Sequence, residues 1–191
     1  MGIVLKDGTG AGNEAKVDTS NRLHTQALTE AAMHEKSSID GDVYFVSTNG
    51  FIDINTLNTE TAILYTKNTS TTDQFVINSI RTCGNQVQKI LMYRNPSTGT
   101  IIDNATAGQN TNANFSSSNT PSLTTYKGAD TYTFTDGTHL ANHVNHVGHS
   151  TEKTGDAIIL GPNDSLGITF ELAASGYVCA ALEGYFETVA T

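Results

Sequence analysis

Four histidines close together form the group of residues whose spacing points most clearly to chemistry: His139, His143, His146 and His149. Neutral imidazoles bind zinc and similar divalent ions, and on a helix the first three would share one face. On a strand, His143 and His149 would share a face and His146 would point away. These four residues are therefore the candidate ligands of a metal site, which subunits could share on an oligomer axis. A polar surface loop whose histidines bond to backbone or water is the simpler interpretation, and a pH-sensitive contact is the third.

No familiar catalytic pattern accompanies these histidines. The zinc-protease pattern H-E-x-x-H is absent because Val144 follows His143, and Glu152 has the wrong spacing for a cupin-type metal site. The glycines between 8 and 12 lack the strand and lysine of a phosphate-binding loop, and no G-x-S-x-G elbow occurs. We therefore predict a protein that is not an enzyme and needs no cofactor, apart from a divalent ion at the histidines.

Composition and charge narrow the partners. The chain has 191 residues, enough for one domain with a sizeable core, and a net charge of −9 with only ten Lys and Arg. Such a chain lacks the basic surface that neutralises phosphates, so we expect no nucleic-acid partner. It also contains no basic stretch followed by an apolar signal segment and no apolar run long enough to span a bilayer, so we expect no membrane partner.

The pattern of apolar residues predicts an all-β fold. Leu166, Ile168, Phe170 and Leu172 alternate with small or polar residues, which is typical of a half-buried strand. About nine such strands are expected, at 43–46, 51–54, 62–68, 75–80, 87–93, 131–135, 157–160, 166–172 and 177–187. We expect the last three to pair in sequence as the core sheet. The unequal connections favour an antiparallel β-sandwich of jelly-roll type over an up-and-down barrel.

Two polar stretches interrupt this pattern. Residues 1–40 are predicted to be an extended N-terminal arm with too little apolar content to fold alone. Contacts with neighbouring subunits would offset its ordering entropy, and an arm folded back on its own domain is the alternative. Residues 41–191 would form the sandwich, with a polar insertion at about 95–130 that supplies no core.

The two cysteines are predicted to be unpaired. Cys83 and Cys179 each lie within an expected strand, and two cysteines do not make a disulfide framework in a chain of this size. We interpret both as buried thiols that act as small hydrophobic side chains, with a bridge as the alternative.

The two ends of the chain resemble structural proteins of tailed bacteriophages. The matching segments are 6–10, 15–17, 21–23 and 41–44, together with Leu160–Ile168. The resemblance leaves 95–150 unmatched. It implies a β-sandwich virion component, often trimeric, that decorates or cements the capsid or lies at the neck or tail. We therefore expect a capsid decoration protein of the virion, assembled in the host cytoplasm, whose partners are its own copies and the major capsid protein or other virion proteins.

Two other functions remain open. The first is a tail or neck adsorption module that binds host-surface carbohydrate through the 95–150 loops. Stacking aromatics would favour it, but only Phe115 and Tyr126 occur there before the strand expected at Thr131. The second is a metal-dependent enzyme on a cupin-like fold, which lacks the ligand pattern.

Overall fold

Eleven strands and one short helix make up the part of the chain that the structure, a computed structural model, describes: residues 39–147 and 151–188. More than half of it is antiparallel β-sheet, as the apolar alternation predicted. The elements are β1 (Val43–Ser47), β2 (Ile52–Ile54), β3 (Thr61–Asn68), β4 (Asp73–Gly84), β5 (Gln88–Arg94), α2 (Thr100–Asn104), β6 (Gln109–Asn112), β7 (Leu123–Lys127), β8 (Thr138–Asn145), β9 (Thr151–Leu160), β10 (Ser165–Leu172) and β11 (Gly176–Thr188).

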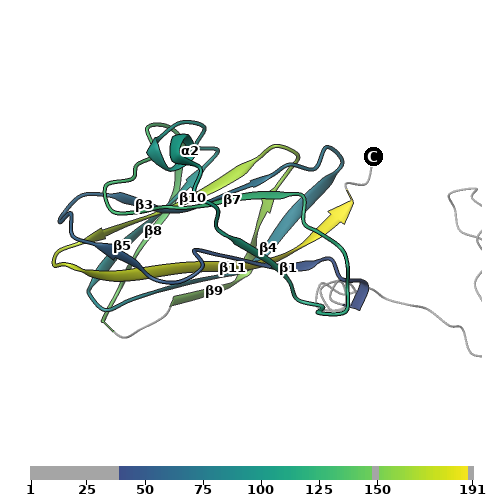
Figure 1. The fold of residues 1–191 in the computed structure, drawn as a ribbon, viewed down its shortest axis with the longest axis horizontal. Coiled ribbons are helices and arrows are strands. Elements are labelled where there is room, and N and C mark those ends of the chain that lie inside the picture. Colours follow the sequence, from purple (N-terminus) through teal and green to yellow (C-terminus); the bar gives the residue numbers. More distant parts are fainter. Residues whose placement is uncertain (1–38, 148–150, 189–191) are drawn as a thin grey trace, which may run out of the picture. The chain divides into compact units, whose positions relative to one another are not determined.

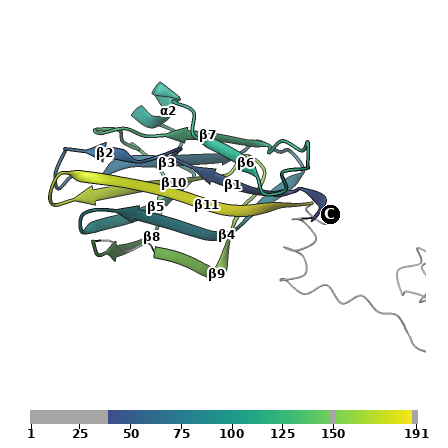
Figure 2. The same ribbon diagram turned by 60° about the horizontal axis from the view of Figure 1, so that its bottom comes forward.

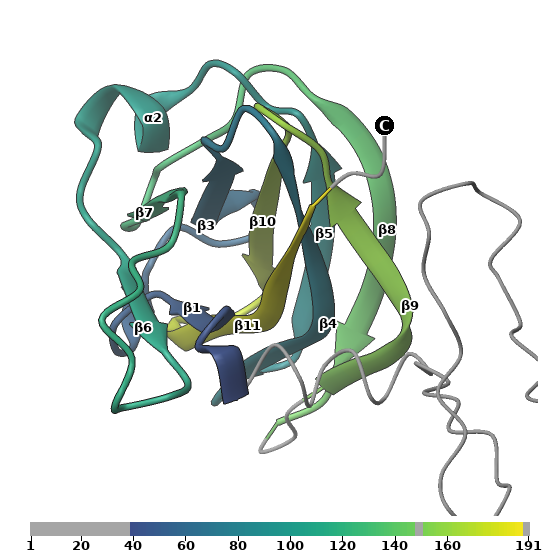
Figure 3. The same ribbon diagram turned by 90° about the vertical axis from the view of Figure 1, so that its right-hand side faces the viewer.

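The strands form two antiparallel sheets that face each other (Figures 1 and 3). Sheet 1 has the order β6-β1-β11-β4-β9, with β2 also paired to β11, and sheet 2 has the order β7-β3-β10-β5-β8. Four early strands each pair with a late one: β1 with β11, β3 with β10, β4 with β9 and β5 with β8. The sandwich is thus one long hairpin, folded so that its tip lies between β5 and β8.

This pairing corrects the expectation that the last three strands form one sheet in sequence. β10 lies in sheet 2, whereas β9 and β11 lie in sheet 1 on either side of β4. The alternation of apolar residues identifies the face that each strand buries, but it carries no information on which strand lies beside it. Most successive strands here lie in different sheets: β10 is in sheet 2 and β11 in sheet 1, and Figure 2 shows the turn at the left that joins them.

The space between the sheets is filled by one apolar core. Its largest side chains include Tyr44, Phe75 and Phe170, each at most 2% exposed. β3 is buried on both faces, as its consecutive apolar residues predicted. β10 was expected to be half-buried, and it too is buried on both faces. Residues at the tip of the hairpin, among them Pro96 and Phe134, cover the outer face of β10.

The predicted polar insertion at about 95–130 contributes more than a surface loop. It adds one edge strand to each sheet, β6 beside β1 and β7 beside β3, and the side chains of Ile101 and Leu123 are buried. The strand expected at 131–135 is absent, and the strand that follows is β8, in the histidine-rich stretch. In the described ranges no helix has the length and apolar character needed to cross a bilayer.

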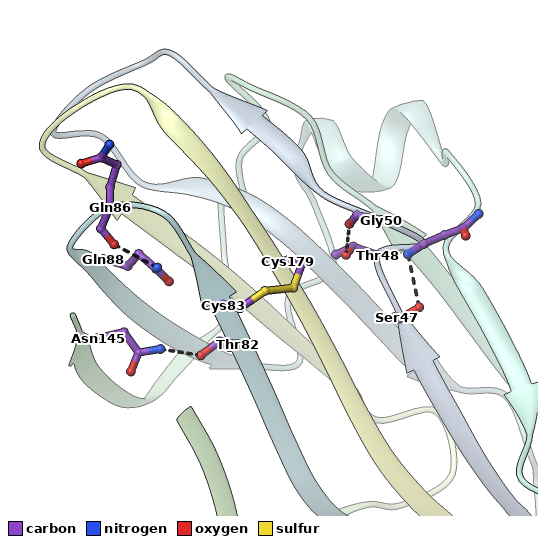
Figure 4. Close-up of a disulfide and its surroundings, with 10 residues drawn as sticks. Ser47, Thr48, Gly50, Thr82, Cys83, Gln86, Gln88, Asn145 and Cys179 are labelled. Atoms are coloured by element: carbon purple, nitrogen blue, oxygen red, sulfur yellow. Dashed lines mark hydrogen bonds between the residues drawn. A yellow bond between two sulfur atoms is a disulfide. The ribbon is translucent and has the colours of Figure 1, made fainter. Parts of the chain in front are cut away.

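A disulfide joins Cys83 and Cys179, contrary to the prediction of two buried thiols. The two residues lie directly opposite each other on β4 and β11, with Cα atoms 5.2 Å apart (Figure 4). Both are partly exposed, because the flanking Val178 and Ala180 take the core positions and Cys179 points to the outer face. The period-two alternation that assigned each cysteine to a strand could not show that the two strands are neighbours.

Candidate functional site

The structure does not bring the predicted metal ligands together on one face. His139 pairs with Tyr93 on the outer side of sheet 2, whereas His143 pairs with the core residue Ile90. A register shift between these two pairs places the two histidines on opposite faces of β8. His146 is exposed beyond β8, and His149 lies outside the described residues. The described residues contain no group of three His, Cys, Asp or Glu side chains that could hold a metal ion. A site completed by His149 or by other subunits stays a prediction.

The outer face of sheet 2 carries a feature that the sequence analysis missed, a row of residues across its five strands that is aromatic on all but β10. In register, Tyr126 of β7 lies opposite Tyr65 of β3, Tyr65 opposite Gly167 of β10, Gly167 opposite Tyr93 of β5, and Tyr93 opposite His139 of β8. The Tyr65 and Tyr126 rings stack with centroids 5.6 Å apart, and Tyr93 meets His139 edge to face at 5.7 Å. Because these residues come from segments far apart in sequence, only the strand pairing could reveal the row.

Phe134 fills the gap that Gly167 leaves in the middle of this row. A Cβ atom on Gly167 would lie 2.6 Å from the Phe134 ring and 3.0 Å from Pro96, so any side chain there would displace the Phe134 ring. The Phe134 ring lies 6.2 Å from both Tyr65 and Tyr93. The tip of the hairpin is therefore packed onto the sheet by a second, smaller apolar cluster. This cluster explains the apolar alternation at 131–135 without a strand, because Tyr132 and Phe134 both pack against residues of sheet 2.

Two pockets flank Phe134 on this face. One, of about 250 Å³, is lined by Glu60, Tyr93, Phe134 and Asp136 among others. Burial raises the pKa of Tyr93 to about 12, and the Glu60 carboxylate adds to the effect through a 2.7 Å hydrogen bond and through its negative charge. The Tyr93 hydroxyl therefore stays a donor at neutral pH. The other, which we call the Tyr126 pocket, measures about 410 Å³ and is lined by both stacked tyrosines, Lys67 and neighbouring polar groups.

Asp136 joins the two chain segments of the hairpin tip, 95–98 and 133–137. Its carboxylate accepts hydrogen bonds from the Ser97 hydroxyl, the Ser97 amide at 2.8 Å and the Thr98 amide at 2.9 Å. These bonds favour the ionised form and lower the pKa of Asp136 from its ordinary value of 3.8 to about 2. The carboxylate thus joins the segment that follows Pro96, which lines the Tyr126 pocket, to the segment that follows Phe134, which lines the other pocket.

Replacing this carboxylate with an amide should change the acid stability of the protein. Because the folded-state pKa is depressed, the stabilisation by Asp136 is present above its unfolded pKa and is lost as the pH falls through about 2. We expect Asp136→Asn to be less stable than wild type at pH 6 and the difference to shrink between about pH 4 and pH 2. Urea unfolding at several pH values measures this difference. Asp53→Asn, an exposed site on β2, is the control, and a gap for Asp136→Asn that is independent of pH would contradict the assignment.

The outer face of sheet 1 carries exposed aromatic side chains. Phe51 is 66% exposed and Tyr177 is 39% exposed, and their ring centroids lie 4.7 Å apart. Phe45, 41% exposed, lies farther along the same face, and the disulfide lies next to Tyr177 on β11. Because Phe45 lies opposite Glu183, six residues along β11 from Tyr177, we call only Phe51 and Tyr177 the sheet 1 aromatic face. Grouped exposed aromatics of this kind mark surfaces that contact other molecules.

The asparagine-rich stretch fixes the start of the sandwich. Asn112 donates to the Gly41 carbonyl at 2.7 Å, Asn114 to the Ile39 carbonyl at 3.0 Å, and Asn119 to the Asp40 carbonyl at 3.2 Å. Gly41 has φ of +81°, and a Cβ atom there would lie 2.2 Å from Ser117. The low apolar content of this stretch thus has a structural reason, since its amides bind backbone carbonyls where the chain enters β1.

The described surface therefore offers contacts suited to binding: stacked rings and hydrogen-bonding groups on sheet 2, and exposed aromatics on sheet 1. The Tyr93 hydroxyl donates a hydrogen bond to the Glu60 carboxylate, and the Asp136 carboxylate accepts one from the Ser97 amide. Comparisons of the chain with protein-family models, curated proteins and solved structures found no match.

Proposed function

We propose that this protein is a non-enzymatic structural subunit of a tailed-bacteriophage virion, a decoration protein that stabilises the capsid. The observation that carries the proposal is the sheet 1 aromatic face, where Phe51 and Tyr177 pack against each other while remaining exposed. Burying such rings against another protein is favourable, since aromatic residues contribute most to many interfaces. In this proposal the face packs against neighbouring copies and the major capsid protein.

The strand order supports a jelly roll, the fold we propose for residues 41–191. In a jelly roll, a long hairpin wraps so that its four strand pairs are distributed over two sheets. The orders β1-β11-β4-β9 and β3-β10-β5-β8 match that arrangement, with β2, β6 and β7 as additions. Viral capsid domains often have this fold, but so do lectins and cupins, so this support is by analogy alone.

The proposal assigns the arm of residues 1–40 to contacts with other subunits. The core of the sandwich is built from residues after Gly41, and the asparagine side chains hold the chain at Ile39–Gly41. Contacts of the arm across subunit boundaries would add buried area without altering this core. A trimer is the oligomer that we propose.

The disulfide fits a protein that functions outside the cytoplasm. Disulfides persist at virion surfaces and in other oxidising environments, but they are rare in the cytosol. A subunit assembled in the host cytoplasm would form the Cys83–Cys179 bond after release of the particle. In this account the bond adds stability when the particle is exposed.

Rebinding to particles tests the proposal. Wild-type protein should bind saturably to purified phage heads that lack it, and Phe51→Ser with Tyr177→Ser should weaken binding by at least about tenfold. Phe115→Ser is the matched control, because Phe115 is 93% exposed but lies in the asparagine-rich stretch. Binding only to tails, or equal binding of the double variant and wild type, would contradict the proposal.

A tail or neck adsorption module is the second candidate function. The aromatic row and the Tyr126 pocket favour it, since the strand pairing places Tyr65, from outside the 95–150 region, beside Tyr126. This candidate predicts that the protein copurifies with tail or neck fractions.

A further inference from the structure

We propose that the Tyr126 pocket binds a saccharide that carries a carboxylate, such as a uronic acid residue of a surface glycan. The proposal is independent of head binding, because the pocket lies on the outer face of sheet 2 whereas the sheet 1 aromatic face lies on the opposite sheet. The pocket volume, about 410 Å³, falls within the range of roughly 300–1,000 Å³ that is usual for small-molecule sites.

One wall of the pocket is apolar and aromatic. It is formed by the Tyr65 and Tyr126 rings, which stack nearly parallel at 14°, together with Pro96 and Ile102. Tyr126 is the partly exposed ring of the pair, and an aromatic ring can accept the C–H groups of a pyranose, which form the apolar side of an otherwise polar molecule. Tyr65 is 5% exposed, and burial raises its pKa, so the wall stays uncharged.

The polar part of the lining lies beside the aromatic part, two residues along the same strands. Lys67 of β3 is opposite Thr124 of β7 and Ser165 of β10, which makes a second row parallel to the aromatic one. Residues two apart on a strand point to the same side and are separated by about 7 Å. A sugar ring in contact with Tyr126 would therefore extend its substituents toward the second row, where Asn163 also lines the pocket.

The charge in the pocket selects an anionic ligand. Among the described residues, Lys67 is the charged side chain that lines the pocket, and no acidic side chain lines it. The Lys67 ammonium has no ion-pair or hydrogen-bond partner within the described residues. An unpaired ammonium beside neutral hydroxyl and amide groups matches one carboxylate surrounded by sugar hydroxyls. The protein as a whole is acidic, at −9, so this local positive site is not part of a general basic surface.

Titration of the full-length ¹⁵N-labelled protein tests the inference. D-glucuronate should give saturable chemical-shift changes at the amides of residues 65–67 and 124–126, and D-glucose should bind about tenfold more weakly for want of the charged contact. Acetate should give no saturable change there. Lys67→Gln should reduce glucuronate affinity about tenfold, to the level of glucose.

Lys127→Gln is the matched control, because it makes the same charge change on β7 outside the pocket lining. Thr124→Val, which removes a lining hydroxyl with little change in shape, should also weaken binding while leaving the fold intact. Equal effects of Lys67→Gln and Lys127→Gln would overturn the proposal, as would acetate binding as tightly as glucuronate or the absence of saturable shifts with either sugar. Head binding by Lys67→Gln, scored separately, should equal that of wild type.

Discussion

Replacing both Cys83 and Cys179 with alanine is expected to lower the free energy of unfolding by about 2–5 kcal/mol. The two cysteines are 96 residues apart in sequence, and closing a loop of about that length removes entropy from the unfolded chain worth roughly 4.7 kcal/mol in the chain-entropy description. For a domain of this size the melting temperature should fall on the order of 10 °C. Urea unfolding and calorimetry measure the two quantities.

Reduction of the wild-type protein provides an independent version of the same experiment, since it breaks the bond without changing the side chains. Ala181→Ser, two residues along β11 on the same outer face, is the control and should change stability by less than about 0.5 kcal/mol. Equal stability of oxidised and reduced protein would contradict the assignment of the disulfide as a main source of stability.

Asn68→Asp is expected to destabilise the protein by about 3–5 kcal/mol at neutral pH, the range for a buried charge without a partner. The Asn68 side chain is fully buried, and its amide lies 2.7 Å from the Asp73 carbonyl, 3.0 Å from that of Leu160 and 3.2 Å from that of Gly161. A carboxylate has no proton to donate to these oxygens. The end of β3 would then lose its attachment to β4 and to the β9–β10 turn.

The effect should depend on pH with a defined sign. Burial against carbonyl oxygens raises the pKa of the introduced carboxyl, so the stability that it retains is present at low pH and is lost as the pH rises through that pKa. Urea unfolding should therefore show the gap between wild type and Asn68→Asp narrowing as the pH falls. Asn55→Asp, at an exposed site, is the control. A gap no larger than that of the control, or one that acid leaves unchanged, would refute the role of Asn68.

Local patterns in the sequence predicted the positions of most strands, although not the burial of β10 on both faces. The alternation from Leu166 to Leu172 identified β10, and the consecutive apolar residues at 62–65 identified β3 as buried on both sides. These predictions succeed because side-chain direction is set within a strand. The strand expected at 131–135 failed because Tyr132 and Phe134 alternate for a different reason: they pack on the face of sheet 2.

Features that depend on which strands are neighbours could not be predicted. The Cys83–Cys179 bond requires β4 beside β11, and the aromatic row requires five strands in one register. Gly167 illustrates the difficulty. Its role becomes clear only in the structure, where the Phe134 ring occupies the space that a side chain at 167 would take. The asparagine-rich stretch was likewise interpreted from composition alone, whereas its amides have specific carbonyl partners.

Hydroxyl-radical labelling of intact particles tests most directly the central claim that the sheet 1 aromatic face is buried in a virion. The account predicts that Phe51 and Tyr177 are labelled several-fold more slowly in purified particles than in the released protein. Phe115, which is exposed and outside this face, should be labelled equally in both and serves as the internal control. Equal labelling of Phe51 and Tyr177 in particles and in free protein, or failure to find the protein in purified particles, would contradict the account.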